Sequence, residues 1–137
     1  MSSALSKNDN LLPLFDQLKP LLAKYEPPLV AVVDRRDRYD LQFDKGYTTK
    51  SLKTGKVTTK HGLSFAAIIV QKHYVGLYFS PIYSHPDEFT HLSERLQTAL
   101  KGKSCIYITA LDPELEGEIA DLLEKGYRLY KDFEGYK

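Results

Sequence analysis

Two apolar runs separated by two residues constrain this chain more than any other feature. Residues 64–71 read SFAAIIVQ and residues 74–81 read YVGLYFSP, with only Lys72 and His73 between them. Runs of this length, rich in β-branched and aromatic residues and joined by a two-residue loop, are typical of a β-hairpin. The sequence therefore predicts an antiparallel hairpin at the centre of a folded core.

The composition indicates one self-sufficient domain. With 137 residues, 42% of them hydrophobic, the chain can bury about two-thirds of its unfolded surface without metals or disulfides. Cys105 is the single cysteine, the opening MSSALSKNDN lacks a signal-peptide stretch, and the longest apolar run, Phe65 to Val70, is too short to cross a bilayer. We therefore expect a single cytoplasmic domain, residues 1–137, without a membrane span or a cofactor.

Two segments before and after the hairpin carry apolar residues at helical spacing. The first begins at Asp9 or Asn10, both suitable caps, and contains Pro20, which predicts a kink or an early end of the helix. The second begins at Ser84, which forms a capping-box pattern with the aspartate three residues later, and ends at Gly102.

A third helix and further strands complete the predicted fold. The helix begins at Asp112, which precedes a first-turn proline, and ends at Gly126. Apolar and alternating runs predict strands at residues 29–34, 39–43 and 104–110. Because helices and strands do not alternate regularly, we predict an α+β fold, an antiparallel sheet of about five strands with three helices packed on it.

The Lys/Thr-rich segment 45–62 differs from the rest of the chain. It contains five lysines, five threonines and no acidic residue, and we expect an exposed hairpin or a loop. Its positive charge suits phosphate groups, but it has no arginine, Tyr47 is its one aromatic residue, and the whole chain carries a net charge of only +1. Nucleic acid is therefore not an expected partner.

Alternation along two of the strands gathers aromatic side chains on one face. Val75, Leu77 and Phe79 point to the core, which leaves the tyrosines between them on the opposite face with a gap at the glycine. Such a face suits a small apolar ligand, a protein partner or a second copy of the chain, unless helix one or the tail covers it. The predicted binding residues are Tyr74, Gly76, Tyr78, Lys103, Cys105 and Tyr107.

The thiol of Cys105 suggests a different function. Lys103 and Ser104 precede it, and His73 is a possible base if the fold brings it near. A catalytic thiol needs a base within hydrogen-bond reach and a lowered pKa, which spacing does not establish. A Cys-dependent enzyme or redox protein therefore stays an alternative, beside the ordinary role of a small apolar strand residue.

Weak iron or divalent-cation binding is the other alternative. Glu114, Glu118 and Asp121 share one face of the third helix and form an acidic ridge, although solvated helix faces look the same and Lys125 is a candidate ion-pair partner. The four histidines are His61, His73, His85 and His91. Their spacing is not that of zinc ligands, so we assign no metal ligands.

Three short motifs resemble the YdhG-like proteins, small bacterial domains of unknown function. They are the Lys-x-Tyr-Val turn at residues 72–75, Phe-Ser-Pro-Ile-Tyr at 79–83 and Gly-Lys-Ser-Cys at 102–105, and the likeness extends over about residues 11–130. The resemblance implies an α+β fold and a cytoplasmic protein, and it supplies no reaction. From the residues and the resemblance together we predict a non-catalytic binding domain that uses its aromatic sheet face.

Overall fold

The computed structural model describes residues 11–102 and 104–133, which form an α+β fold around a six-stranded antiparallel sheet. The order of the strands is β1-β2-β3-β4-β6-β5. The strands are β1 (Val30–Arg35), β2 (Arg38–Lys50), β3 (Val57–Val70), β4 (Val75–Phe79), β5 (Leu100–Lys101) and β6 (Cys105–Ile108). The helices are α2 (Leu12–Ala23), α3 (Ser80–Ser84), the 3-10 turn η1 (Pro86–Phe89), α4 (Glu94–Ala99) and α5 (Pro113–Lys131). The predicted fold class is confirmed, with one strand and one α-helix more than expected.

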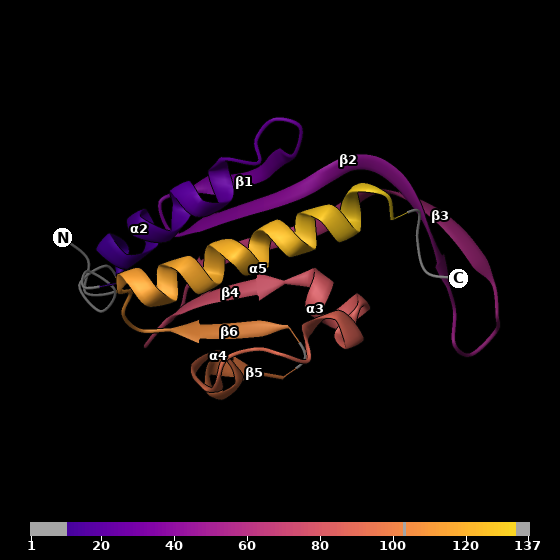
Figure 1. The fold of residues 1–137 in the computed structure, drawn as a ribbon. Coiled ribbons are helices and arrows are strands. Elements are labelled where there is room, and N and C mark those ends of the chain that lie inside the picture. Colours follow the sequence, from indigo (N-terminus) through magenta and orange to yellow (C-terminus); the bar gives the residue numbers. More distant parts are fainter. Residues whose placement is uncertain (1–10, 103, 134–137) are drawn as a thin grey trace.

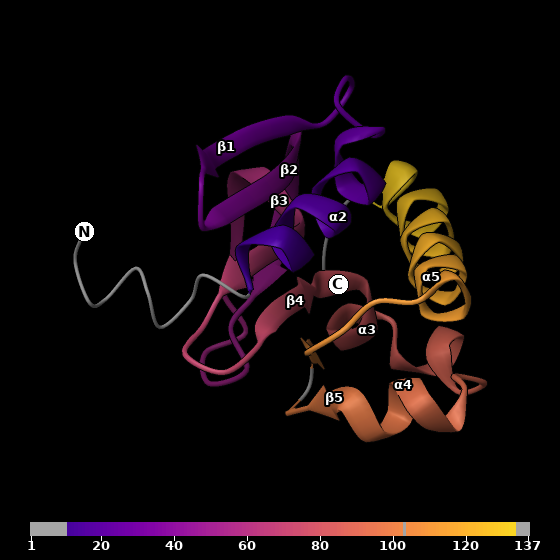
Figure 2. The ribbon, with the colours of Figure 1, turned by 90° about the vertical axis from the view of Figure 1, so that its left-hand side faces the viewer.

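Helices α2 and α5 lie side by side over one face of the sheet (Figures 1 and 2). Between them and the strands lies the core, where side chains of both helices meet one face of the sheet. The predicted alternation is confirmed, because Val75, Leu77 and Phe79 are fully buried. Other fully buried members of this core are Leu18, Leu22, Leu41, Phe65, Ile68, Ile106, Ile119, Leu123 and Tyr130.

The central hairpin forms where the two apolar runs predict it. β3 and β4 pair from Ala66 opposite Phe79 to Val70 opposite Val75. The backbone N–H of Gln71 donates to the Tyr74 carbonyl at 2.8 Å and closes the turn.

Strands β2 and β3 continue far beyond the core as a two-stranded ribbon. An irregularity interrupts the pairing between Phe43 and Gly46. Beyond it the two strands pair again, from Gly46 opposite His61 to Lys50 opposite Val57. Gly55, with a φ of 72°, lies in the connecting turn, a left-handed conformation that favours glycine. This ribbon contains the Lys/Thr-rich segment and projects past the helices at the right of Figure 1.

The single helix predicted for residues 84–102 is wrong. Its apolar residues belong to η1, α4 and β5, which are separate short elements. Ser84 caps no helix, since its hydroxyl lies 2.6 Å from the Tyr130 hydroxyl, and α4 is capped by Ser93, which accepts from the Leu96 N–H at 3.2 Å. Leu100 leaves the helical path because it pairs with Ile106 in the sheet. Tertiary contacts therefore divide residues 84–102 into separate elements, although the apolar residues of this segment have helical spacing.

Two helix ends also differ from expectation. α2 continues past Pro20 to Ala23, since burial of Leu22 holds the last turn against the core, and the predicted caps Asp9 and Asn10 lie outside the described residues. α5 begins as predicted, with Asp112 accepting from the Leu115 N–H at 2.9 Å, but it runs through Gly126 to Lys131. At Gly126 the missing side chain admits the ring of Phe79 against the helix backbone.

Candidate functional site

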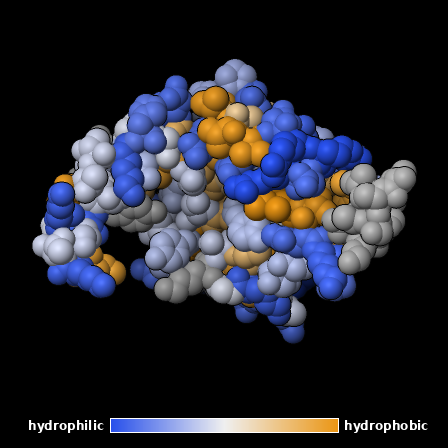
Figure 3. All heavy atoms as spheres, turned by 180° about the vertical axis from the view of Figure 1, so that it is seen from behind, coloured by the Kyte–Doolittle hydropathy of each residue, from blue (hydrophilic) through white to orange (hydrophobic). Residues whose placement is uncertain are grey.

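The sheet face opposite α2 and α5 is the candidate site. Figure 2 shows α2, α4 and α5 on one side of the sheet, and Figure 3 shows the molecule from the opposite side. On that side Val30, Val32 and Tyr107 are 41%, 51% and 38% exposed. Within residues 11–102 and 104–133, therefore, no helix covers these side chains.

Strands β4 and β6 bring the predicted residues together on this face. Gly76 pairs with Tyr107, and Tyr78 pairs with Cys105. Tyr74, just before β4, stacks on Tyr107 with ring centroids 3.7 Å apart and an interplanar angle of 11°. We call the set Tyr74, Gly76, Tyr78, Cys105 and Tyr107 the tyrosine face. Lys103, the remaining predicted member, lies outside the described residues.

The gap expected at Gly76 is filled by a neighbouring ring. A Cβ atom on Gly76 would lie only 2.8 Å from Cε2 of Tyr78, so the Tyr78 ring lies directly over the glycine. The Tyr78 hydroxyl accepts a hydrogen bond from Nε2 of Gln71 at 3.0 Å, which fixes the ring in this place. The tyrosine face is therefore closed over at the position where a recess was predicted.

The remainder of the open face is mixed in character. Arg38 and Asp40 of β2 form an ion pair of 3.3 Å, and Nε of Arg38 is buried without a hydrogen-bond partner. The exposed valines Val30 and Val32 of β1 form an apolar edge beyond this pair. Hydrophobic areas and hydrophilic side chains alternate across this view in Figure 3. Tyrosine and arginine are among the residue types that are enriched at protein interfaces.

Hydrogen bonding and burial raise the pKa of three groups on the tyrosine face, Tyr74, Tyr78 and Cys105. A hydrogen bond with Tyr107 raises the pKa of Tyr74, and burial raises the pKa of Tyr78. Burial also raises the pKa of the Cys105 thiol, an effect that the hydrogen bond with Tyr78 partly opposes. A reactive thiol needs the opposite shift, because the thiolate is the nucleophile. The surroundings of Cys105 therefore favour an inert thiol.

On the acidic ridge of α5, Glu118 already has a side-chain partner. Glu118 accepts a hydrogen bond from the Ser93 hydroxyl at 3.1 Å. The Lys125 ammonium lies over the Phe89 ring, 5.3 Å from its centroid, rather than at the Asp121 position that the spacing suggested. Groups of three or more His, Cys, Asp or Glu side chains suited to a metal ion do not occur in the described parts of the chain.

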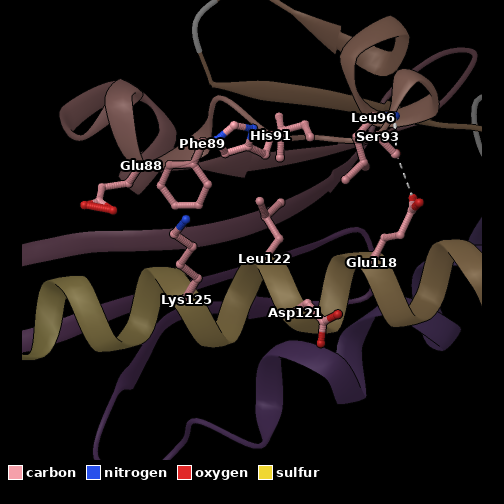
Figure 4. Close-up of a pocket in the computed structure, with 10 residues that line it drawn as sticks. Glu88, Phe89, His91, Ser93, Leu96, Glu118, Asp121, Leu122 and Lys125 are labelled. Carbon is pink, nitrogen blue, oxygen red and sulfur yellow. Dashed lines mark hydrogen bonds between the residues drawn. The ribbon is translucent and has the colours of Figure 1, made fainter.

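One feature of the ridge could not be found from the sequence. A hollow of about 360 Å³ lies between α5 and the η1–α4 segment, with Phe89 and Leu122 in its lining (Figure 4). It exists because residues 84–102 fold as separate elements instead of one helix. The helical pattern of the sequence indicates the opposite, so no local signal reveals this hollow.

Comparisons with protein-family models, with curated proteins and with solved structures found no match for this chain. The described helices include none that is long and apolar enough to cross a membrane. The case for a function therefore rests on the surfaces of the molecule itself.

Proposed function

We propose that this chain is a non-catalytic binding domain whose tyrosine face docks against a protein partner. The observation that carries the proposal is the stacked pair of Tyr74 and Tyr107 on an uncovered sheet face. Tyrosine rings supply a large contact area with a polar tip and little conformational entropy to lose, which is why they are enriched at interfaces. A stacked pair is already ordered before a partner arrives, so binding costs less.

The shape of the face favours a protein over a small apolar ligand. Small-molecule sites are concave and surround most of the ligand. On the tyrosine face the ring of Tyr78 occupies the space over Gly76, and a ligand there would have to displace a ring held by Gln71. A flat aromatic patch, separated by β3 from the partly buried Arg38–Asp40 pair, suits a second flat surface instead. A second copy of this chain is the simplest such partner.

A Cys105-dependent reaction is the weaker alternative. The thiol is half-buried and burial raises its pKa, so little thiolate exists at neutral pH. A nucleophile in this position would need a base that lowers the pKa. The proposed role of Cys105 is therefore to fill the space beside Tyr78 in the interface.

The experiment compares the chain with its Tyr107→Ser variant in two measurements. Sedimentation over a wide range of concentrations tests self-association, and crosslinking of the pure protein followed by mass spectrometry locates the contact. If Tyr107 is a central contact, its loss costs about 2 kcal/mol, which weakens association about thirtyfold. Tyr83→Ser is the matched control, because Tyr83 is 56% exposed on α3, away from the tyrosine face.

Partners other than a second copy are tested in the same way. Proteins retained by the immobilised chain should be lost with Tyr107→Ser and kept with Tyr83→Ser, and a retained protein counts only if it protects Tyr107 from acetylation. The proposal is refuted if the chain sediments as a monomer throughout and both variants retain the same proteins as the original chain.

A further inference from the structure

The ribbon formed by the outer parts of β2 and β3 concentrates positive charge at one end of the molecule. Its segment, residues 45–62, contains five lysines and no acidic residue and therefore carries a charge of +5. The other 14 of the 19 lysines and arginines stand against all 18 acidic residues, so the rest of the chain carries −4. The net charge of +1 is thus the sum of two regions of opposite sign. Figure 3 shows the ribbon at the left as a mostly hydrophilic arm.

We propose that this ribbon binds double-stranded DNA in the major groove, through phosphate contacts that do not depend on the base sequence. The net charge of the whole chain disfavours nucleic acid, but a partner responds to the charge of the surface that it contacts. The segment has no arginine and one aromatic residue, which disfavours base recognition, whereas phosphate contacts need only exposed positive charge. The proposal is independent of the function proposed for the tyrosine face, because the two surfaces share no residue.

Four lysines of the ribbon are exposed and unpaired. Among the residues that the structure describes, their ammonium groups have no carboxylate partner, whereas Lys19, Arg36 and Arg95 each form an ion pair of 2.7 Å. A phosphate group therefore displaces no carboxylate of the protein when it binds. The four lysines are Lys50, Lys53, Lys56 and Lys60.

These lysines lie on both faces of the ribbon and at its end. Lys60 pairs with Tyr47, and Lys50, three positions further along, pairs with Val57. Because successive side chains of a strand alternate, the two lysines point to opposite faces, and the other two lie in the turn between the strands. A DNA groove has a phosphate backbone along each wall, so lysines on both faces contact both walls at once. A flat anionic surface such as a membrane would meet only one face or the tip.

The dimensions of the ribbon match the major groove. Its outer pairing, from Gly46 opposite His61 to Lys50 opposite Val57, extends over roughly 14 Å at about 3.4 Å per residue. The major groove is about 12 Å wide and admits a two-stranded ribbon. The end of the ribbon also lies beyond the Debye length of about 8 Å at physiological salt, so the negative charge of the body repels DNA only weakly there.

Contacts at both ends hold the ribbon in shape before DNA binds. Nζ of Lys45 donates to two backbone carbonyls in the last turn of α5, at 2.5 and 3.3 Å, and fixes the root of the ribbon. In the turn, the backbone N–H groups of Lys53 and Thr54 donate to the Ser51 hydroxyl at 3.3 and 3.2 Å. A pre-formed ribbon loses less conformational entropy on binding. Leu52 in this turn is fully exposed and would face the base edges, where thymine methyl groups offer apolar contact.

The test measures binding of the full chain to a fluorescent DNA duplex by fluorescence anisotropy at several salt concentrations. Four lysine–phosphate contacts predict a slope of about −3.6 in log K against log salt, which is a loss of roughly 150-fold in affinity between about 50 and 200 mM. An RNA duplex of the same sequence has a deep, narrow major groove, so it should bind at least severalfold more weakly. Equal affinity for the two duplexes, or binding that salt does not weaken, overturns the proposal. Tighter binding to vesicles of phosphatidylcholine and phosphatidylserine than to DNA overturns it as well.

Two triple variants with the same change in net charge locate the contact. In the ribbon variant the replacements are Lys53→Gln, Lys56→Gln and Lys60→Gln. In the body variant they are Lys72→Gln, Lys101→Gln and Lys131→Gln, and all six lysines are exposed.

The ribbon variant should reduce the magnitude of the salt slope by about 2.7, because each lost phosphate contact removes about 0.9. The body variant should keep the slope of the original chain. Thermal unfolding of both variants checks that the fold is intact, and Lys53→Gln alone, with an expected change of about 0.9, tests the site if the triple variant is disturbed. An unchanged slope in the ribbon variants, or equal losses in the ribbon and body variants, refutes the assignment.

Discussion

Gly126 and Gly117 of α5 should respond in opposite ways to the same substitution by alanine. A Cβ atom on Gly126 would collide with the Phe79 ring and would lie 2.9 Å from Cγ of Pro81. A Cβ atom on Gly117 would have no heavy atom within 4 Å. Both positions are inside the helix, so the gain in helix propensity, about 1 kcal/mol, is common to the two variants.

The difference between the variants measures the packing at Gly126. Carbon atoms in contact lie about 3.5–4.0 Å apart, so the new methyl group overlaps its neighbours by more than half an ångström at about 2.9 Å. Phe79 has no room to move, because it is fully buried and packs edge-on against Phe65 and Phe89. Overpacking of this kind costs about 1–3 kcal/mol. Gly117→Ala should then stabilise the fold by up to about 1 kcal/mol, and Gly126→Ala should destabilise it by up to about 2 kcal/mol.

Urea unfolding followed by circular dichroism gives both free energies, provided that the slope of each transition is unchanged. Equal stability of the two variants, within about 0.5 kcal/mol, would show that Phe79 does not pack against the α5 backbone. Close packing of the Phe79 ring would then no longer explain why a glycine occupies position 126 inside a helix.

Three other predictions concern titratable groups. Arg95 lowers the pKa of Asp112, so the Asp112 carboxyl binds fewer protons in the folded state than in the unfolded state. The stability that this carboxylate contributes should therefore disappear as the pH falls through the acid range. In that range the thermal unfolding temperature of Asp112→Asn should depend less on pH than that of the original chain. Cys105 should react with iodoacetamide more slowly than a free thiol at neutral pH, since burial raises its pKa. A faster reaction would instead support the alternative of a Cys105-dependent enzyme. Burial raises the pKa of Tyr25 and of Tyr39, so both phenols keep their protons in the folded state to a higher pH than in the unfolded state. The stability that the two protonated tyrosines contribute is lost as the pH rises past their pKa in the folded state. An absorbance titration should show tyrosines that ionise only on unfolding, and a single transition near the ordinary pKa of about 10 would contradict this.

Local sequence patterns predict those parts of the fold that depend on neighbours in the chain. Alternation assigns Leu77 to the core and Tyr78 to the opposite face because side chains of a strand point alternately to its two sides. Asp112 marks a helix start because a carboxylate satisfies N–H groups of the first turn. Where spacing alone was used, at residues 84–102, the prediction of one helix is wrong, since pairing of Leu100 with β6 outweighs helical periodicity.

Patterns along the chain are enough to establish the fold class, the central hairpin and the division of β4 and β6 into an aliphatic and an aromatic side. Packing between distant segments settles three other features: both long helices lie on the aliphatic side, Tyr78 fills the space over Gly76, and a hollow opens beside α5. The physical reason is that alternation and capping are set by bonds and contacts within a few residues. Covering a face or leaving it open depends instead on where distant segments find the largest apolar area to bury, and that is a property of the whole chain.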